Sequence, residues 1–219
     1  MITIAIIVIT GILSFMAFNN QNLLDKMIFY PPAITNRNEW YRFITCGFIH
    51  ADMGHLFFNM FTLFIFGREI EAIFKQVFGN GLGAVLFLAL YIVALAVCLI
   101  PTYLQNKDNY HYRSLGASGA ISAVVFAYML INPMNYLGII FVPIFIPAFL
   151  FGLIYIIVSY YLDKSKAGNI NHSAHLFGGL FGLIFTFFVF SAFADINLIA
   201  HFTEQIKNTD IKNLIRFGY

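Results

Sequence analysis

The sequence predicts an all-α integral membrane protein with six transmembrane helices. Of its 219 residues, 60% are hydrophobic and only 10% are charged, whereas soluble globular domains carry about 25% charged residues. Charge-free stretches recur along the chain, close to the roughly 20 residues that a helix needs to cross a bilayer. The net charge of +2 comes without a basic patch or a glycine-rich phosphate loop, so nucleic acid is not an expected partner.

The first three spans are expected at residues 2–18, 53–74 and 81–104. The opening stretch has no basic residue before its apolar run and no clear small-residue cleavage site after it. We therefore expect a retained span and not a cleaved signal peptide. Residues 19–49 form a long polar and aromatic connection, and connections of this length are often functional.

Residues 114–162 are expected to contain two spans. This segment has no Lys, Arg, Asp or Glu and is too long for one membrane helix. The run "NPMN" at residues 132–135 divides it into spans four and five, because Pro ends helices and Asn favours turns. Pro143 and Pro147 are expected to kink or delay span five. Span six is expected at residues 170–194.

The chain is expected to divide into a six-span domain, residues 1–194, and a tail, residues 195–219. Isoleucine and leucine recur at short intervals in the tail, which is typical of an amphipathic helix on a membrane surface. Six spans place both termini on one side of the membrane. Lys and Arg number five on that side and seven on the other, so the positive-inside rule does not decide the orientation.

Cys46 and Cys98 lack metal-site spacing.

Three polar clusters are expected at membrane depth, where polar groups are costly and usually functional. The first is "HADMGHLFFN", in which His55 and Asn59 are four residues apart and share a helix face. The second is "GASGAIS", which contains Ser118 and Ser122. The third is "NHSAHLFGGLFG", which contains His175.

Nucleophilic catalysis is one chemistry that these clusters could support. Ser118 needs a base to become a nucleophile, and His is the usual base. Ser118 begins span four and His175 lies in the first turns of span six, so both lie near the same membrane face if the spans alternate. Small residues let helix backbones approach closely, and they occur on both spans: Gly116, Gly119, Ala120 and Ala123 on span four, and Gly178, Gly179 and Gly182 on span six.

No carboxylate lies in the interior of an expected span, so acyl-transfer chemistry here would use a Ser118–His175 dyad. A developing oxyanion would still need hydrogen-bond donors. The backbone N–H of Ser118, at a helix N-terminus, is one. Asn59 is a natural second donor, and His55 on the same helix face is a third. This chemistry needs no metal and no other cofactor.

Five segments of the chain resemble the motifs of rhomboid intramembrane serine proteases, with order and spacing intact across roughly residues 1–194. The segments are "EWYR" at 39–42, "HADMGHLFFN" at 50–59, "GREIE" at 67–71, "GASG" at 116–119 and "AHLFGGLFG" at 174–182.

The resemblance implies a rhomboid-like bundle in which Ser118 is the nucleophile and His175 the general base. It implies that His55 and Asn59 join the Ser118 N–H in binding the oxyanion, and that His50 is a structural member of that cluster. It also implies membrane-protein substrates, span five as a mobile gate, and termini in the cytoplasm, with the plasma membrane as the expected location.

One position departs from the family pattern. An aromatic residue that packs against the catalytic His often stands four residues after the nucleophile, but here that residue is Ser122. We therefore expect another aromatic residue or a hydrogen bond to hold the imidazole.

Simpler roles exist for each of these residues. Taken alone, Ser118 would more often be a small helix-packing residue and His175 a satisfied core histidine, and His172 and His111 are expected to be loop residues. A metal or haem site built from histidines is disfavoured because the H-E-x-x-H motif is absent and the interiors of the spans offer no carboxylate ligand. The main alternative is an inactive rhomboid-like protein that binds membrane helices without cutting them, although such a protein would be expected to lack the Ser or the His.

Overall fold

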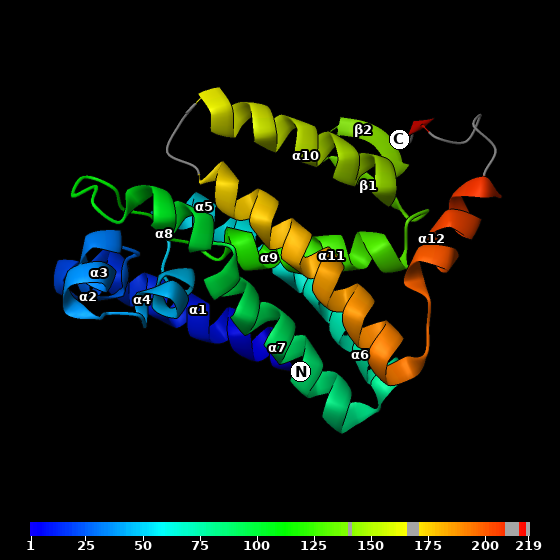
Figure 1. Ribbon diagram of the computed structural model, residues 1–219, viewed down its shortest axis with the longest axis horizontal. Helices are drawn as coiled ribbons and strands as arrows, with labels where there is room; N and C mark the ends of the chain where they lie inside the picture. Colours follow the sequence, from blue (N-terminus) through cyan, green and yellow to red (C-terminus); the bar gives the residue numbers. More distant parts are fainter. Residues whose placement is uncertain (140–141, 166–170, 209–214, 218–219) are drawn as a thin grey trace.

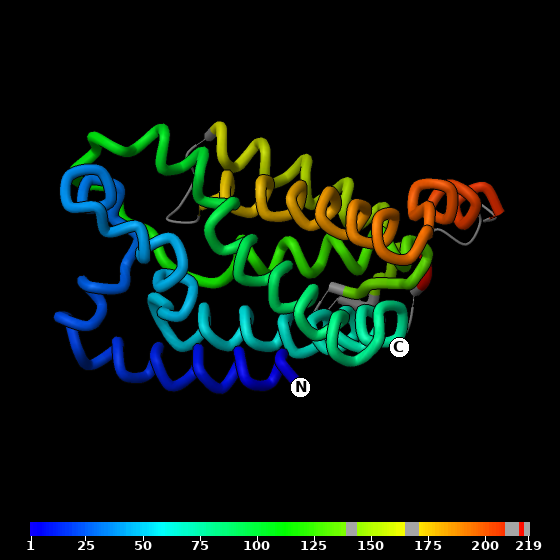
Figure 2. Tube along the Cα trace, turned by 60° about the horizontal axis from the view of Figure 1, so that its bottom comes forward, coloured from blue at the N-terminus to red at the C-terminus, as the bar shows by residue number. Residues whose placement is uncertain are grey.

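The computed structural model describes residues 1–139, 142–165, 171–208 and 215–217. Within these residues, helical segments form a bundle, as Figure 1 shows. Helix α1 (Ile2–Phe18) lies at one edge and α10 (Ala148–Ser165) at the opposite edge, as the view in Figure 2 makes clear. The predicted helical membrane architecture is confirmed.

The first two predicted spans are present as helices. Helix α1 begins and ends where the sequence predicts. The second span consists of α5 (Met53–Thr62), the π-helical turn η2 (Leu63–Gly67) and α6 (Arg68–Phe78). The buried carboxylate of Glu71 on α6 accepts hydrogen bonds from the backbone N–H groups of Ile2 and Thr3, both at 2.9 Å. It thereby satisfies donors at the start of α1 that have no partner within that helix.

The third span is divided into α7 (Asn80–Val97) and α8 (Ile100–Asn106). Pro101 lies in the first turn of α8, where no helical hydrogen bond requires its missing N–H. The same residue prevents α7 from continuing, because Pro cannot donate the next hydrogen bond of that helix. Among the described residues, Asn80–Asn106 and His172–Ala194 are each long and apolar enough to cross a membrane. Helices α1 and α9 (Ser118–Ile131) are shorter and also apolar.

Helix α9 is the centre of the bundle. It packs against α5, α7, α10 and α11 (His172–Ala194), and Figure 2 shows it between the layers that these helices form. Most of its side chains are buried, as expected for a helix that is apolar on every face. Its closest partner is α11, where Gly178 and Gly182 face the backbone carbonyls of Gly119 and Ala123 so tightly that a Cβ on either glycine would collide with them. The predicted close approach of spans four and six is therefore present.

A short antiparallel sheet precedes span five and was not predicted. Strand β1 (Tyr136–Ile139) pairs with β2 (Val142–Pro147), which also pairs with β3 (Arg216–Phe217), in the order β1-β2-β3. Helix α10 begins directly after Pro147, so the predicted delay of span five is confirmed. The strands were missed because a short apolar run cannot be assigned to strand or helix by periodicity alone.

The long connection between α1 and α5 is also structured. It contains four short helical pieces, α2 (Gln21–Met27), α3 (Pro31–Arg37), α4 (Arg42–Thr45) and the 3₁₀ turn η1 (Cys46–Phe48). Arg42 is buried, and its Nη1 donates to the backbone carbonyls of Asp25 at 2.8 Å and Ile28 at 2.7 Å. The buried guanidinium thus joins α4 to the end of α2.

Only part of the tail is the helix that the sequence predicts. Helix α12 (Leu198–Lys207) begins at Asn197, whose side chain accepts from the backbone N–H groups of Ile199 and Ala200. Further along, Arg216–Phe217 forms strand β3 and not a helix. Residues 209–214 and 218–219 lie outside the described part of the chain.

Candidate active site

The turn that leads to Ser118 is held by the long connection. Phe29 and Ser114 exchange both backbone hydrogen bonds, at 3.0 and 3.1 Å, and the Gly116 N–H donates to the Cys46 carbonyl at 2.9 Å. Gly116 has a φ of +112°, in a region that L-residues rarely adopt. This glycine lets the chain turn into α9 with Ser118 as the first helical residue.

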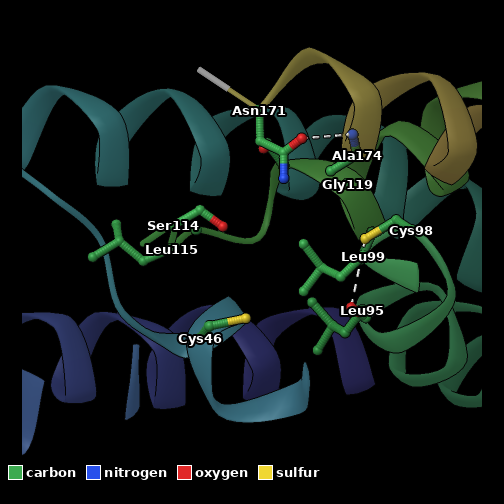
Figure 3. A pocket seen from close by; sticks show the side chains of 12 residues that line it. Cys46, Leu95, Cys98, Leu99, Ser114, Leu115, Gly119, Asn171 and Ala174 are labelled. Atoms are coloured by element: carbon green, nitrogen blue, oxygen red, sulfur yellow. Dashed lines mark hydrogen bonds between the residues drawn. The ribbon is translucent and has the colours of Figure 1, made fainter. Parts of the chain in front are cut away.

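The structure brings Ser118 and His175 together. The Oγ atom of Ser118 lies 2.7 Å from the Nε2 atom of His175. The start of α11 is fixed by Asn171, whose Oδ1 accepts from the Ala174 N–H at 3.0 Å, as drawn in Figure 3. This cap places His175 in the first turn of α11, beside the first turn of α9. A hydroxyl and an imidazole at this distance can exchange a proton.

His55 and Asn59 face the same turn from α5. A Cβ built on Gly116 would lie 2.8 Å from the Nε2 atom of His55 and 3.7 Å from the Nδ2 atom of Asn59. The Nδ2 atom of Asn59 is buried and has no hydrogen-bond partner among the described residues. Gly116 was expected on the face of span four that meets span six, but it lies before α9 and contacts α5, because its turn points toward that helix.

His50 lies in the connection ahead of α5 and is fully buried. Its Nδ1 is 3.0 Å from the Ser14 Oγ, which itself donates to the Phe48 carbonyl at 3.2 Å, so His50 is the donor. Its ring packs edge-on against His55, with centroids 4.9 Å apart. Burial and then the neighbouring His55 lower the pKa of His50 to about 3, so the ring is neutral near pH 7.

The sequence suggested that His172 is a loop residue, but the structure places it in a helix. It is the first residue of α11, is buried, and packs edge-on against His175 with centroids 5.8 Å apart. The reason is the Asn171 cap, which starts the helix directly before His172. His111, by contrast, lies in an exposed turn as predicted. In the described part of the chain, no three His, Cys, Asp or Glu side chains are grouped so that they could hold a metal ion.

The small residues near the site serve different contacts. Gly119 packs against the Cys98 side chain and lies close to the Ala174 carbonyl, where a Cβ would come within 3.2 Å. Gly179 leaves room for the Phe126 ring, which a Cβ would approach to 2.9 Å. Both glycines therefore allow the close packing around the serine–histidine pair.

Two cavities adjoin Ser118. The larger, about 570 Å³, is lined mainly by apolar side chains of α5, η2, β1, α9, α10 and α11, with Asn59, Ser118 and His175 among its polar members. The smaller, about 20 Å³, lies beside Cys46 and Cys98 (Figure 3) and has room for about one water molecule. Both cysteines are buried free thiols.

An aromatic ring does lie against the imidazole of His175, but it comes from another helix. Tyr155 of α10 packs its ring against His175 with centroids 6.2 Å apart and an interplanar angle of 26°. The Tyr155 hydroxyl lies 2.9 Å from the Oγ atom of Ser122. No feature of the sequence pointed to this residue, because it is one of 12 tyrosines in an aromatic-rich chain.

Comparison with known proteins agrees with these motifs. A family model for the rhomboid domain matches residues 37–192. The rhomboid protein YdcA of Bacillus subtilis is 28% identical over 165 residues, covering 74% of this chain and 73% of its own. RHOMBOID-like protein 12, mitochondrial, of Arabidopsis thaliana is 29% identical, covering 74% of this chain and 49% of its own. The human presenilin-associated rhomboid-like protein, mitochondrial, is 33% identical, covering 62% of this chain and 34% of its own.

Proposed function

Because the chain belongs to the rhomboid family, we propose that it is an intramembrane serine endopeptidase that cleaves transmembrane-helix substrates. The observation that carries this proposal is the 2.7 Å contact between the Ser118 Oγ and the His175 Nε2. The contact lies in the wall of a large, mostly apolar cavity. An apolar substrate segment fits such a cavity better than a soluble peptide does.

In the proposed mechanism, His175 takes the hydroxyl proton as Ser118 attacks the scissile carbonyl carbon. The tetrahedral intermediate then breaks its C–N bond, and His175 returns the proton to the leaving amine. Water hydrolyses the resulting acyl-enzyme, with His175 again acting as the base. No step requires a metal or another cofactor.

The oxyanion of the intermediate is stabilised by three donors in this proposal. The Ser118 N–H lies in the first turn of α9, where helix N–H groups lack an intrahelical partner. The Nδ2 of Asn59 is buried and has no hydrogen-bond partner in the described part of the chain. It and the Nε2 of His55 both lie beside Gly116, two residues before the nucleophile. Donors that are fixed before the reaction lose no free energy in reorganising as charge develops.

The substrate must expose its backbone before it can be cut. A helix protects its carbonyl groups by hydrogen bonding, so the scissile segment must unwind locally. Gly, Pro and other poor helix formers near the membrane face make this easier. We propose that α10 is the gate through which a substrate span enters the cavity, which α10 lines with Phe151 and Tyr155.

A fluorophosphonate probe tests the proposed function without knowledge of the substrate. The wild-type protein in detergent micelles should be labelled covalently, whereas Ser118→Ala should not. Ser173→Ala, which removes a buried serine of α11 outside the proposed dyad, is a matched control and should be labelled like wild type. A folded wild-type protein that resists the probe would favour the alternative function, a rhomboid-like protein that binds membrane helices without cutting them.

The proposed orientation has both termini in the cytoplasm and the site opening toward the other face of a plasma membrane. Two of the relatives are named as mitochondrial, and the charge count favours neither orientation. Reporter fusions at the C-terminus in a bacterial host distinguish the two orientations. A green fluorescent protein fusion should fluoresce and an alkaline phosphatase fusion should be inactive if the C-terminus is cytoplasmic.

A further inference from the structure

Tyr155 contacts His175 of the proposed dyad directly and is linked to Ser118 through Ser122. Its ring lies against the imidazole of His175, with centroids 6.2 Å apart and an interplanar angle of 26°, an offset-stacked arrangement. Its hydroxyl lies 2.9 Å from the Ser122 Oγ. Ser122 stands one helical turn after Ser118, and its Oγ lies 2.9 Å from the Ser118 carbonyl oxygen.

The direction of these hydrogen bonds follows from the number of protons. The Ser122 hydroxyl has one proton, and the Ser118 carbonyl can only accept, so Ser122 donates to Ser118. The Tyr155 hydroxyl must then donate to the Ser122 Oγ. The result is a directed chain from α10 to the backbone of the nucleophile.

A second ring also packs against Tyr155. Phe126 of α9 packs edge-on against it, with centroids 5.5 Å apart. The Phe126 ring occupies the space beside Gly179, because a Cβ on Gly179 would come within 2.9 Å of that ring. Tyr155 is thus fixed by a ring on α9, a ring on α11 and a hydrogen bond through Ser122.

We propose that Tyr155 is a positioning residue that holds the His175 imidazole with its Nε2 on the Ser118 hydroxyl. This inference rests on the proposed function. Because Ser122 is small, the aromatic ring that contacts His175 comes from α10 and not from α9. The hydrogen bonds through Ser122 fix the position of the Tyr155 ring along α9. The dyad is therefore assembled from three helices, and α10 supplies the support for the base.

The test compares fluorophosphonate labelling kinetics of wild type, Tyr155→Leu and Tyr155→Phe. Tyr155→Leu should lower the maximal labelling rate roughly tenfold, equivalent to about 1.4 kcal/mol, with the half-saturating probe concentration unchanged. Tyr155→Phe keeps the ring and should stay within about threefold of wild type, which corresponds to about 0.7 kcal/mol. Tyr161→Leu removes an exposed tyrosine from the same helix and should match wild type.

Several outcomes would overturn this role. They are a wild-type rate in Tyr155→Leu, equal losses in the Leu and Phe variants, or a loss confined to the half-saturating concentration. If Tyr155→Leu does not fold, Tyr155→Met keeps most of the buried volume without a ring and should show the same loss. A wild-type protein that the probe does not label would instead count against the proposed function, so the two failures are distinguishable.

Discussion

The Oγ atom of Ser118 and the Nε2 atom of His175 lie 2.7 Å apart although the residues are 57 positions apart in the chain. The contact depends on the glycines that let α9 and α11 approach backbone to backbone. It also depends on the two helix starts, because each residue lies in the first turn of its helix. Helix packing and helix capping together therefore determine the geometry of the candidate dyad.

Single replacements of His175 and His172 distinguish the proposed base from the histidine beside it. His175→Ala should reduce cleavage of a helical membrane substrate and probe labelling by at least about a thousandfold, because among the described residues His175 is the base within hydrogen-bond distance of the Ser118 hydroxyl. His172→Ala removes a ring that packs edge-on against His175 and should keep activity within about tenfold of wild type. Equal losses in the two variants, measured on folded protein, would contradict the assignment of His175 as the base.

Asn59→Ala should reduce activity without reducing stability. Loss of one oxyanion donor typically lowers the rate about 10²–10³-fold. The Nδ2 of Asn59 has no hydrogen-bond partner among the described residues, so no such bond is lost from that donor on truncation. Labelling kinetics and thermal unfolding of the same preparation measure both effects. A large drop in melting temperature with unchanged labelling would indicate a structural residue and not an oxyanion donor.

The proximity of Ser118 and His175 is predictable from the sequence because polar residues stand out in an apolar chain. Ser118, His175, His55 and Asn59 come together as the motif spacing predicts. Tyr155 could not be found this way, since an aromatic residue in a membrane span is no signal by itself. Its role depends on how deep α10 packs, which is a tertiary property.

Other boundaries have local causes. Span five starts late, as predicted, because α10 cannot extend back through Pro147. The strands before it lie in an apolar run whose composition suits strand and helix alike. His172 joins α11 because Asn171 caps the helix. Such boundaries depend on single residues and are difficult to place from hydropathy alone.

Gly178→Ala should loosen the contact between α9 and α11. The new Cβ would collide with the backbone of Gly119, which cannot move as a flexible side chain can. We expect the free energy of unfolding to fall by roughly 1–3 kcal/mol, as in other overpacked cores, and labelling to slow because Ser118 and His175 move apart. In Gly11→Ala the new Cβ meets no atom within 4 Å, so that control should be at least as stable as wild type. If the two variants unfolded alike, the close approach would not matter for stability.

His50 should make the fold sensitive to acid. Its pKa is lowered from 6.5 to about 3 in the folded protein, so between these values the unfolded chain binds a proton that the folded chain does not. Stability is then complete above about pH 6.5 and falls as the pH drops toward about 3, by about 1.4 kcal/mol per pH unit. Between about pH 7 and about pH 5, His50→Asn should therefore lose about 2 kcal/mol less than wild type, as measured by equilibrium unfolding. His111→Asn, in an exposed turn, should follow the wild-type pH dependence, and an unchanged slope in His50→Asn would show that His50 is not the group responsible.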